Sequence, residues 1–281
     1  MAQFTNSSKL ILNNENNTIR GRSRQWGILN EGSIYTLGGN DTLSGDGLNE
    51  DGIFNLNGIN TGSGNDSVIG RGAAGLASEA FLFTKSGNDE IRGSGFYAGI
   101  WNVSHIKSGE GNDSIIGNGV RGGITNYNRL STGIGSDLVR GKSKSGAGIL
   151  NSRTIRTGRD NDTVDALVGG FAGGGKTLLG SDSDKLIGFG DGIFNGGRGN
   201  DALVQGQGTY TITEVSPRSI RSRVSDKIEA PKVYTITRQG DSSTMYVTGF
   251  ETISGTSGPE YDFRQGVLSV SGSGSATFEP F

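Results

Sequence analysis

The chain has 281 residues, of which 51 are Gly and 4 are Pro, a Gly content far above the usual level of about 7%. Its formal net charge of −2 provides neither the basic field that nucleic-acid binding uses nor a polybasic membrane anchor. With no Cys and one His, it excludes disulfides, thiolate catalysis and multi-histidine metal sites, so any metal would be ligated by oxygen. No apolar run approaches the roughly 18 residues of a membrane helix. We therefore expect a soluble all-β protein with no membrane span and no nucleic-acid partner.

Residues 1–16 have no basic region followed by an apolar core of about 7 residues or more, so they do not resemble a Sec signal peptide. They also stand outside the regular pattern that begins at residue 17. An open end of a repetitive β-structure has to be covered, because exposed strand edges promote aggregation. We therefore expect residues 1–16 to form an N-terminal cap.

A repeat of about 24 residues extends from residue 17 to residue 204. One Asp recurs in each copy at spacings of 25, 23, 24, 24, 25, 22 and 17 residues, and Asn17 takes this position in a degenerate first copy. The column consists of Asp41, Asp66, Asp89, Asp113, Asp137, Asp162, Asp184 and Asp201. Aliphatic residues occupy the position two after the Asp in every copy, and those seven and thirteen before it in most copies.

Columns of like residues at a constant interval predict a right-handed parallel β-solenoid, in which equivalent positions stack from coil to coil. The aliphatic columns would then fill its core. Eleven positions before the Asp, the column reads Asn30, Asn55, Asn102, Asn126 and Asn151, with Ser78 as the exception. We expect a hydrogen-bonded ladder at an inside corner, because buried amides need partners. A simple preference of Asn for turns would explain single residues but not five in register.

Residues 205–281 depart from the repeat and are expected to form a C-terminal β cap. Alternating patterns at 208–213, 233–238 and 243–254 predict a small antiparallel sheet. The segment between the first two strands carries a cluster of Lys and Arg. A solvated loop is the simpler interpretation of this cluster, and an anionic partner is the alternative.

The Asp column has the chemistry of a calcium site. Gly occupies two of the four positions before most of the Asp residues, so the backbone can adopt positive φ and direct carbonyl groups inward beside the carboxylate. Carboxylates about 4.8 Å apart on stacked strands would repel by about 3–4 kcal/mol at an effective dielectric constant near 20, which implies intervening cations. Turn propensity alone would place Asp at variable positions. The column therefore predicts several Ca²⁺ ions bound by all eight Asp residues.

The turn pattern is [TS]-G-x-G-N-D-x-[ILV]-x-G, best preserved as GGRGNDALV at 196–204. It resembles the RTX, or haemolysin-type calcium-binding, repeat family, whose nonapeptides form a parallel β-roll around calcium. Because most coils hold one such motif, the resemblance implies calcium along one edge only. The sequence departs from the pattern where Leu37 and Lys85 replace the Gly four before the Asp, and where Asp160 and Asp182 replace the Gly two before it.

The same resemblance implies type I secretion, in which an uncleaved C-terminal segment is recognised and folding waits for external calcium. It thus implies an extracellular or cell-surface protein. We expect a secreted or surface repeat protein with a structural or binding role, whose candidate partners are calcium and a polysaccharide or cell surface. The Gly/Ser-rich stretch at 268–281 is compatible with a secretion segment.

An enzyme is the alternative from a different class: a β-helix acting on an extracellular polysaccharide or a small molecule, with structural or catalytic calcium. Arg159, Asp160, Asp162 and Asp165 form the densest polar cluster that such an enzyme would use. Irregular copies at 71–84 and 166–179 are where a pocket would form. Catalytic residues and substrate remain unassigned.

Three further patterns carry less weight. An ice-binding or adhesive solenoid ranks third, on a Thr column five before the Asp: Thr36, Thr61, Thr84, Thr132 and Thr157, with Ser108. The segment 170–177 matches the Walker A pattern, but it lies in frame with the repeat and leaves no room for the helix that a P-loop opens. His105 has no obvious catalytic partner, and a surface or groove histidine is its default interpretation.

Overall fold

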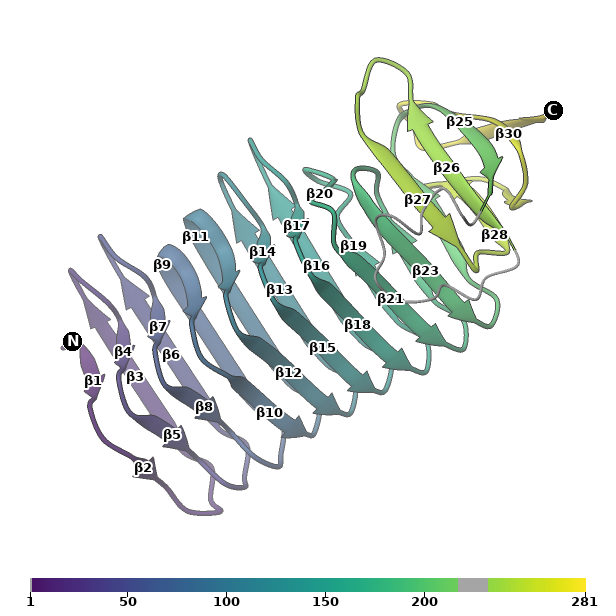
Figure 1. The fold of residues 1–281 in the computed structure, drawn as a ribbon. Coiled ribbons are helices and arrows are strands. Elements are labelled where there is room, and N and C mark those ends of the chain that lie inside the picture. The colour runs from purple at the N-terminus through teal and green to yellow at the C-terminus, as the bar shows by residue number, and fades with distance from the viewer. Residues whose placement is uncertain (1, 217–231) are drawn as a thin grey trace.

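The computed structural model describes residues 2–216 and 232–281, and in these ranges every regular element is a β-strand. Figure 1 shows coils stacked along one axis from the N-terminus, with a small group of antiparallel strands at the C-terminal end. This confirms the all-β parallel solenoid with antiparallel C-terminal strands. Most of the basic cluster expected between residues 213 and 233 lies outside the described residues.

Each coil has three straight segments, and each segment stacks in parallel on its equivalents in the neighbouring coils. The segments after the Asp turn are β3 (Thr18–Ser23), β6 (Thr42–Gly47), β9 (Ser67–Ser78), β11 (Glu90–Asn102), β13 (Ser114–Gly119), β16 (Leu138–Ser143), β19 (Thr163–Asp165), β22 (Lys185–Ile187) and β24 (Ala202–Gln205). Strands β9 and β11 continue into the second segment, which is otherwise made by β1 (Phe4–Asn6), β4 (Ile28–Asn30), β7 (Ile53–Asn55), β14 (Ile124–Asn126), β17 (Ile149–Asn151) and β20 (Phe171–Ala172).

The third segment leads into the Asp turn and forms a separate sheet. Its strands are β2 (Leu10–Ile11), β5 (Ser33–Tyr35), β8 (Gly58–Asn60), β10 (Leu82–Ser86), β12 (His105–Glu110), β15 (Arg129–Ile134), β18 (Thr154–Arg159), β21 (Lys176–Ser181) and β23 (Gly192–Arg198). Strands β1 and β2 pair with β4 and β5 in the repeat register, Phe4 with Ile28 and Leu10 with Ile34. The segment expected to be an N-terminal cap therefore contains a further, shorter coil of the same stack.

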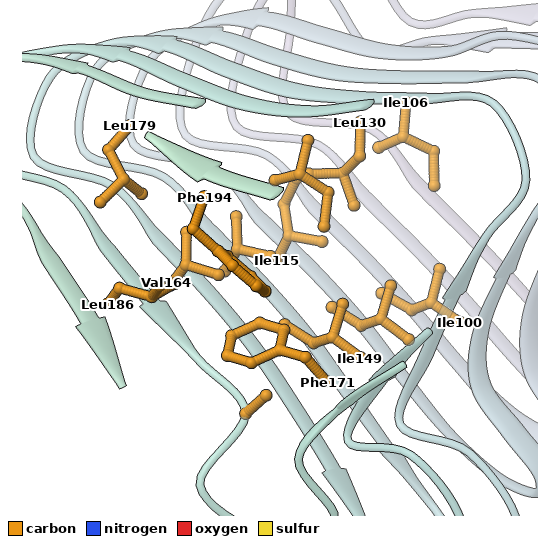
Figure 2. Close-up of a cluster of buried hydrophobic side chains, with 14 of the residues drawn as sticks. Ile100, Ile106, Ile115, Leu130, Ile149, Val164, Phe171, Leu179, Leu186 and Phe194 are labelled. Carbon is orange, nitrogen blue, oxygen red and sulfur yellow. The ribbon is translucent and has the colours of Figure 1, made fainter. Parts of the chain in front are cut away.

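The core is a triangular column of aliphatic side chains, three from each coil. In one coil these are Ile115, Ile124 and Leu130, all fully buried. Figure 2 shows that such side chains point into the space between the sheets, and that Phe171 and Phe194 fill it near the C-terminal end. Burial of one such aliphatic side chain contributes roughly 1.5–3 kcal/mol, so the predicted columns are the main source of stability.

The predicted Asn ladder is present at the corner between the second and third segments. Asn30 Nδ2 donates to Asn55 Oδ1 over 2.8 Å, and Asn126 Nδ2 donates to Asn151 Oδ1 over 2.9 Å. The ladder is interrupted at Ser78, because its hydroxyl donates to the Ala80 carbonyl and leaves Asn102 Oδ1 without a partner. These Asn side chains are buried and structural.

The C-terminal strands are β25 (Gly208–Val215), β26 (Val233–Arg238), β27 (Thr244–Thr248), β28 (Thr252–Gly255), β29 (Glu260–Asp262), β30 (Gly266–Val270) and β31 (Ala276–Pro280). Strands β25, β26, β27, β30 and β31 pair antiparallel, as expected for the cap. However, β27 and β28 also pair in parallel with β23 and β24. Strands β27 and β28 therefore add one further coil to the stack, although about forty residues separate β27 from the end of β24.

Candidate functional site

The Asp turn is made by two backbone positions with positive φ. In one coil, Gly133 and Gly135 have φ of 130° and 121°. A Cβ atom at Gly133 would lie 1.9 Å from the Gly109 carbonyl oxygen, so the stacked turns leave no space for a side chain. The four residues that replace Gly at these positions adopt smaller positive values: Leu37 (69°), Lys85 (75°), Asp160 (73°) and Asp182 (85°). A residue with a Cβ atom tolerates positive φ only near this left-handed well, so the replacements keep the turn at some conformational cost.

The eight predicted Asp side chains lie in a single internal column at this turn. In each step, Oδ1 of one Asp accepts the backbone N–H of the Asp one coil closer to the N-terminus. Asp113 Oδ1 accepts the N–H of Asp89 over 2.8 Å, and Asp137 Oδ1 accepts the N–H of Asp113 over 2.8 Å. The same bond joins every successive pair from Asp41 to Asp201, at 2.8–2.9 Å. We call this column the Asp ladder.

Among the described residues, none forms a hydrogen bond with the second carboxylate oxygen of a ladder residue. All eight side chains are at most 3% exposed, and the Oδ2 atom of every one is buried without a hydrogen bond. Such an atom loses its water shell on folding, which costs a charged group more than a neutral one. Burial raises the pKa of Asp66 and Asp113, and hydroxyl groups of the neighbouring Thr column, Thr61 beside Asp66 and Ser108 beside Asp113, lower it by less. Eight repetitions of this arrangement in register indicate that Oδ2 meets a proton or a cation.

The environment of the ladder disfavours negative charge. Burial, followed by the charges of Asp137 and Asp89, raises the pKa of Asp113 to about 7. Burial is also the largest cause at Asp162 and Asp184, where the pKa rises to about 8 and about 7. Without a bound cation, several ladder residues would therefore retain protons near neutral pH.

A second ladder borders the first on the outside of the turn. The residue before each Asp is usually Asn, and its side-chain oxygen accepts the backbone N–H of the equivalent residue one coil later. Asn88 Oδ1 accepts from Asn112, and Asn112 Oδ1 accepts from Ser136, over 2.7 and 2.8 Å. The Asn and Asp of one turn thus link it to the following and the preceding coil, respectively. This explains why the pair Asn-Asp recurs.

The two ends of the Asp ladder are closed by different residues. At the N-terminal end, Asn17 donates both its backbone N–H and its side-chain amide to Asp41 Oδ1, at 2.7 and 3.0 Å. At the other end, Glu251 Oε2 accepts the backbone N–H of Asp201 over 2.7 Å. The repeat arithmetic missed Glu251 because it follows Asp201 by 50 residues. One sequence signal matches the repeat: Ile253 follows Glu251 by two positions, as an aliphatic residue follows each Asp of the ladder.

The acidic cluster of the enzyme alternative is not brought together. Asp162 belongs to the internal ladder, whereas Asp165 lies on the first segment and pairs with Arg140 over 2.7 Å. Asp160 is exposed in the turn and accepts the Gly135 N–H, and Arg159 is exposed on the third segment. Three different sides of the coil thus separate these residues, so the predicted catalytic cluster is wrong.

His105 is half-buried, with Nε2 3.3 Å from Ser131 Oγ. Burial, followed by the charges of Arg129 and Lys107, lowers its pKa. No hydrogen bond or ion pair joins its ring to a carboxylate among the described residues, so the pair lacks the third member of a triad.

The Thr column that motivated ice binding points inward. Its members are fully buried apart from Ser108, which is 1% exposed, and Thr132 Oγ1 donates to the Thr157 carbonyl over 3.1 Å. These residues therefore present no outward Thr face. The Walker-like segment passes through β20 into β21 with no helix, and Thr177 is buried in the core. It is an ordinary part of a coil.

The fold and the ladder define a parallel β-solenoid with an internal column of carboxylates. Comparison of the chain with protein-family models, curated proteins and solved structures found no match. Over residues 2–216 and 232–281, no helix has the length and hydropathy to span a membrane.

Proposed function

We propose that this protein is a calcium-stabilised structural repeat protein that acts outside the cell or at its surface, and that the Asp ladder binds a row of Ca²⁺ ions. The observation that carries the proposal is the set of eight buried Oδ2 atoms without partners. The ladder would supply Oδ2 ligands from Asp41, Asp66, Asp89, Asp113, Asp137, Asp162, Asp184 and Asp201.

The donor set fits Ca²⁺ better than other common metals. Carboxylate and carbonyl oxygens suit hard cations, and Ca²⁺ accepts more ligands in less regular geometry than Mg²⁺. The described residues contain no group of three or more acidic or imidazole side chains placed to hold a metal. Each ion would therefore share carboxylates from adjacent coils and take its other ligands from carbonyl groups, hydroxyls and water. The ion would supply positive charge and link consecutive coils.

Coupling of calcium to folding follows from this arrangement. A cation that binds the folded ladder and not the unfolded chain stabilises the fold by mass action. Extracellular modules use sites with dissociation constants of roughly 10⁻⁴–10⁻³ M, which would keep this ladder empty inside a cell and filled outside it. With sites of that affinity, the protein would fold after export.

Circular dichroism and thermal melting during EDTA and calcium titrations test the proposal. We expect calcium to raise the melting temperature, with calorimetry or equilibrium dialysis showing several bound ions per chain. An unchanged β spectrum and melting temperature after chelation, with no bound calcium, would refute the proposal.

Type I secretion through the C-terminal segment is part of the same proposal. The structure changes how it should be tested, because Leu268 and Val270 of β30 are buried and β30 pairs with β25. Deleting residues 255–281 would disrupt the cap as well as remove a signal. Fusion of residues 255–281 to a reporter separates the two effects: export of the fusion supports the proposal, and retention contradicts it.

A further inference from the structure

The sheet formed by the third segments carries a groove on its outer face. The groove has a volume of about 890 Å³ and is lined by residues from β10, β12, β15 and β18. These are four consecutive strands of the sheet, as Figure 1 also shows. Because stacked strands lie about 4.8 Å apart, the groove follows the solenoid axis for roughly 14 Å.

The floor of the groove is a row of glycines, at positions where the fold leaves no space for a side chain. Gly109, Gly133 and Gly158 have φ of 130–132°, and a Cβ atom on any of them would lie 1.7–1.9 Å from a carbonyl oxygen of the preceding coil. The floor is therefore flat backbone. At one end of the row, Lys85 occupies the same column with φ of 75° and an exposed side chain.

The groove is mainly basic, and no ion pair of the fold uses its cations. Three basic residues line it, Lys85, Lys107 and Arg159, against one acidic residue, Glu110. The three basic side chains are exposed, and none of the ion pairs among the described residues includes them.

The register shows that the stack does not require these charges. Tyr35 and Asn60 occupy the column of Lys107 in earlier coils, and the residues paired with Arg159 in the neighbouring coils are Ile134 and Ser181. The lowered pKa of His105 reports the same positive field, since Arg129 and Lys107 contribute to it after burial.

One aromatic residue, Phe83, lines the groove close to Lys85. The rings of Phe81 and Phe83 stack with centroids 5.0 Å apart, and His105 meets Phe83 edge-on at 5.2 Å. A Cβ atom at Gly58 would lie 2.3 Å from the Phe81 ring, so Phe81 is enclosed between Gly58 and Phe83. The one aromatic ring in the groove lining, Phe83, is thus packed against both Phe81 and His105.

We propose that this groove binds a linear acidic polysaccharide whose sugar rings carry carboxylate groups. An open groove along the axis fits an extended chain, and its cations are distributed over different coils so that they can meet repeated anionic groups. Arg side chains suit carboxylates because their planar fork can donate two parallel hydrogen bonds. A single-stranded nucleic acid stacks successive bases on several aromatic side chains, whereas Phe83 is the one aromatic residue in the groove lining. The groove floor includes Gly133 of the Asp turn, but the groove would use exposed basic side chains, whereas the ladder carboxylates are buried inside the coil. The inference therefore goes beyond the calcium proposal and does not depend on it.

Fluorescence polarisation with a labelled oligogalacturonate, too short to gel with calcium, tests the inference on the full chain at fixed calcium concentration. The groove variant is Lys107→Glu with Arg159→Glu, which reverses two of the three basic residues that line the groove. The control variant is Lys142→Glu with Lys144→Glu, which reverses two exposed basic residues elsewhere on the coil and changes the net charge equally. Both variants must keep the wild-type β spectrum; if the groove variant does not, Lys107→Gln with Arg159→Gln replaces it.

We expect wild-type binding that weakens with added salt, a loss of affinity of about tenfold or more in the groove variant, and little change in the control. Failure of the wild type to bind, equal losses in both variants, or equal binding of a neutral oligosaccharide would overturn the inference. Tighter binding of a labelled oligothymidylate, with the same dependence on the groove, would assign the groove to nucleic acid instead. A protein that shows no response to calcium but loses oligogalacturonate binding selectively in the groove variant would refute the calcium proposal alone.

Discussion

Asp201 and Glu251 are joined by a hydrogen bond of 2.7 Å from the backbone N–H of Asp201 to Glu251 Oε2, across 50 residues of sequence. Strand β28 pairs with β24 so that Thr252 stands opposite Ala202, which places Glu251 in the ladder column. The C-terminal segment therefore extends the ladder as well as covering the end of the solenoid.

Glu251→Ala should leave the buried Asp201 N–H without a partner and destabilise the last coil by about 1–3 kcal/mol. Glu251→Gln keeps an acceptor oxygen and should cost much less. Hydrogen exchange of the Asp201 amide measures this directly: we expect faster exchange in the Ala variant than in the Gln variant. Equal protection in both would mean that the hydrogen bond does not stabilise this end.

Asp113→Asn should have opposite effects with and without calcium. An Asn oxygen can still accept the Asp89 N–H, but the side chain carries no charge. In EDTA at pH 8 the substitution removes a buried charge and should raise the melting temperature. In saturating calcium it removes a ligand and should lower it. The same direction of change under both conditions would contradict calcium binding at this position.

Asp113→Ala should cost more bound calcium than Asp41→Ala. Asp113 lies between Asp89 and Asp137, so it would contribute to an ion on either side, whereas Asp41 has uncharged Asn17 on one side. Because solenoid stability is roughly a sum of nearest-neighbour terms, the central variant should also melt lower. Calcium stoichiometry by equilibrium dialysis and melting curves measure both effects. Equal losses, or none, would mean that the carboxylates are not shared ligands.

The calcium-free protein should lose stability as the pH rises from about 4 to about 8. The folded pKa values of Asp113, Asp162 and Asp184, about 7, 8 and 7, lie above the ordinary value of 3.8, so the folded state binds protons that the unfolded state releases. Stability from these groups is complete below pH 4 and disappears as the pH passes the folded pKa values. Melting curves in EDTA at several pH values should show this decline, and saturating calcium should reduce it. A metal-free protein that gains stability over this range would refute the assignment.

Asn126→Ala should destabilise the protein by about 2–3 kcal/mol with or without calcium. The side chain donates to Asn151 and accepts from Asn102, so its removal leaves buried amide groups unpaired at the corner. Denaturant unfolding in calcium and in EDTA measures the loss. A loss that depended on calcium would indicate that the Asn ladder at the corner is coupled to the Asp ladder.

The sequence by itself determined the period, the fold class, the Asn ladder at the corner and the stacking of the eight Asp residues in one column, but not the hydrogen bonds that their Oδ1 atoms accept. Stacking places residues one period apart directly above one another, so a column in the sequence is also a column in space. The columns of Gly before the Asp likewise predicted positive φ at the turn. The four residues that replace Gly there, such as Lys85 and Asp160, also adopt positive φ.

Only the tertiary structure decided what lies across the coil and beyond the regular repeat. Periodicity does not say which way a column faces, so the buried Thr column was mistaken for a candidate outer face, and proximity in sequence wrongly grouped Asp160, Asp162 and Asp165. Glu251 extends the ladder although it follows Asp201 by 50 residues, an interval that does not fit the repeat period. The basic groove also escaped notice, because its charges occupy several columns and meet only where the Gly row flattens the surface between neighbouring strands. In a solenoid, the repeat interval predicts which residues stack along the axis. The direction in which each side chain points, and which columns lie next to each other, depend on how each coil bends.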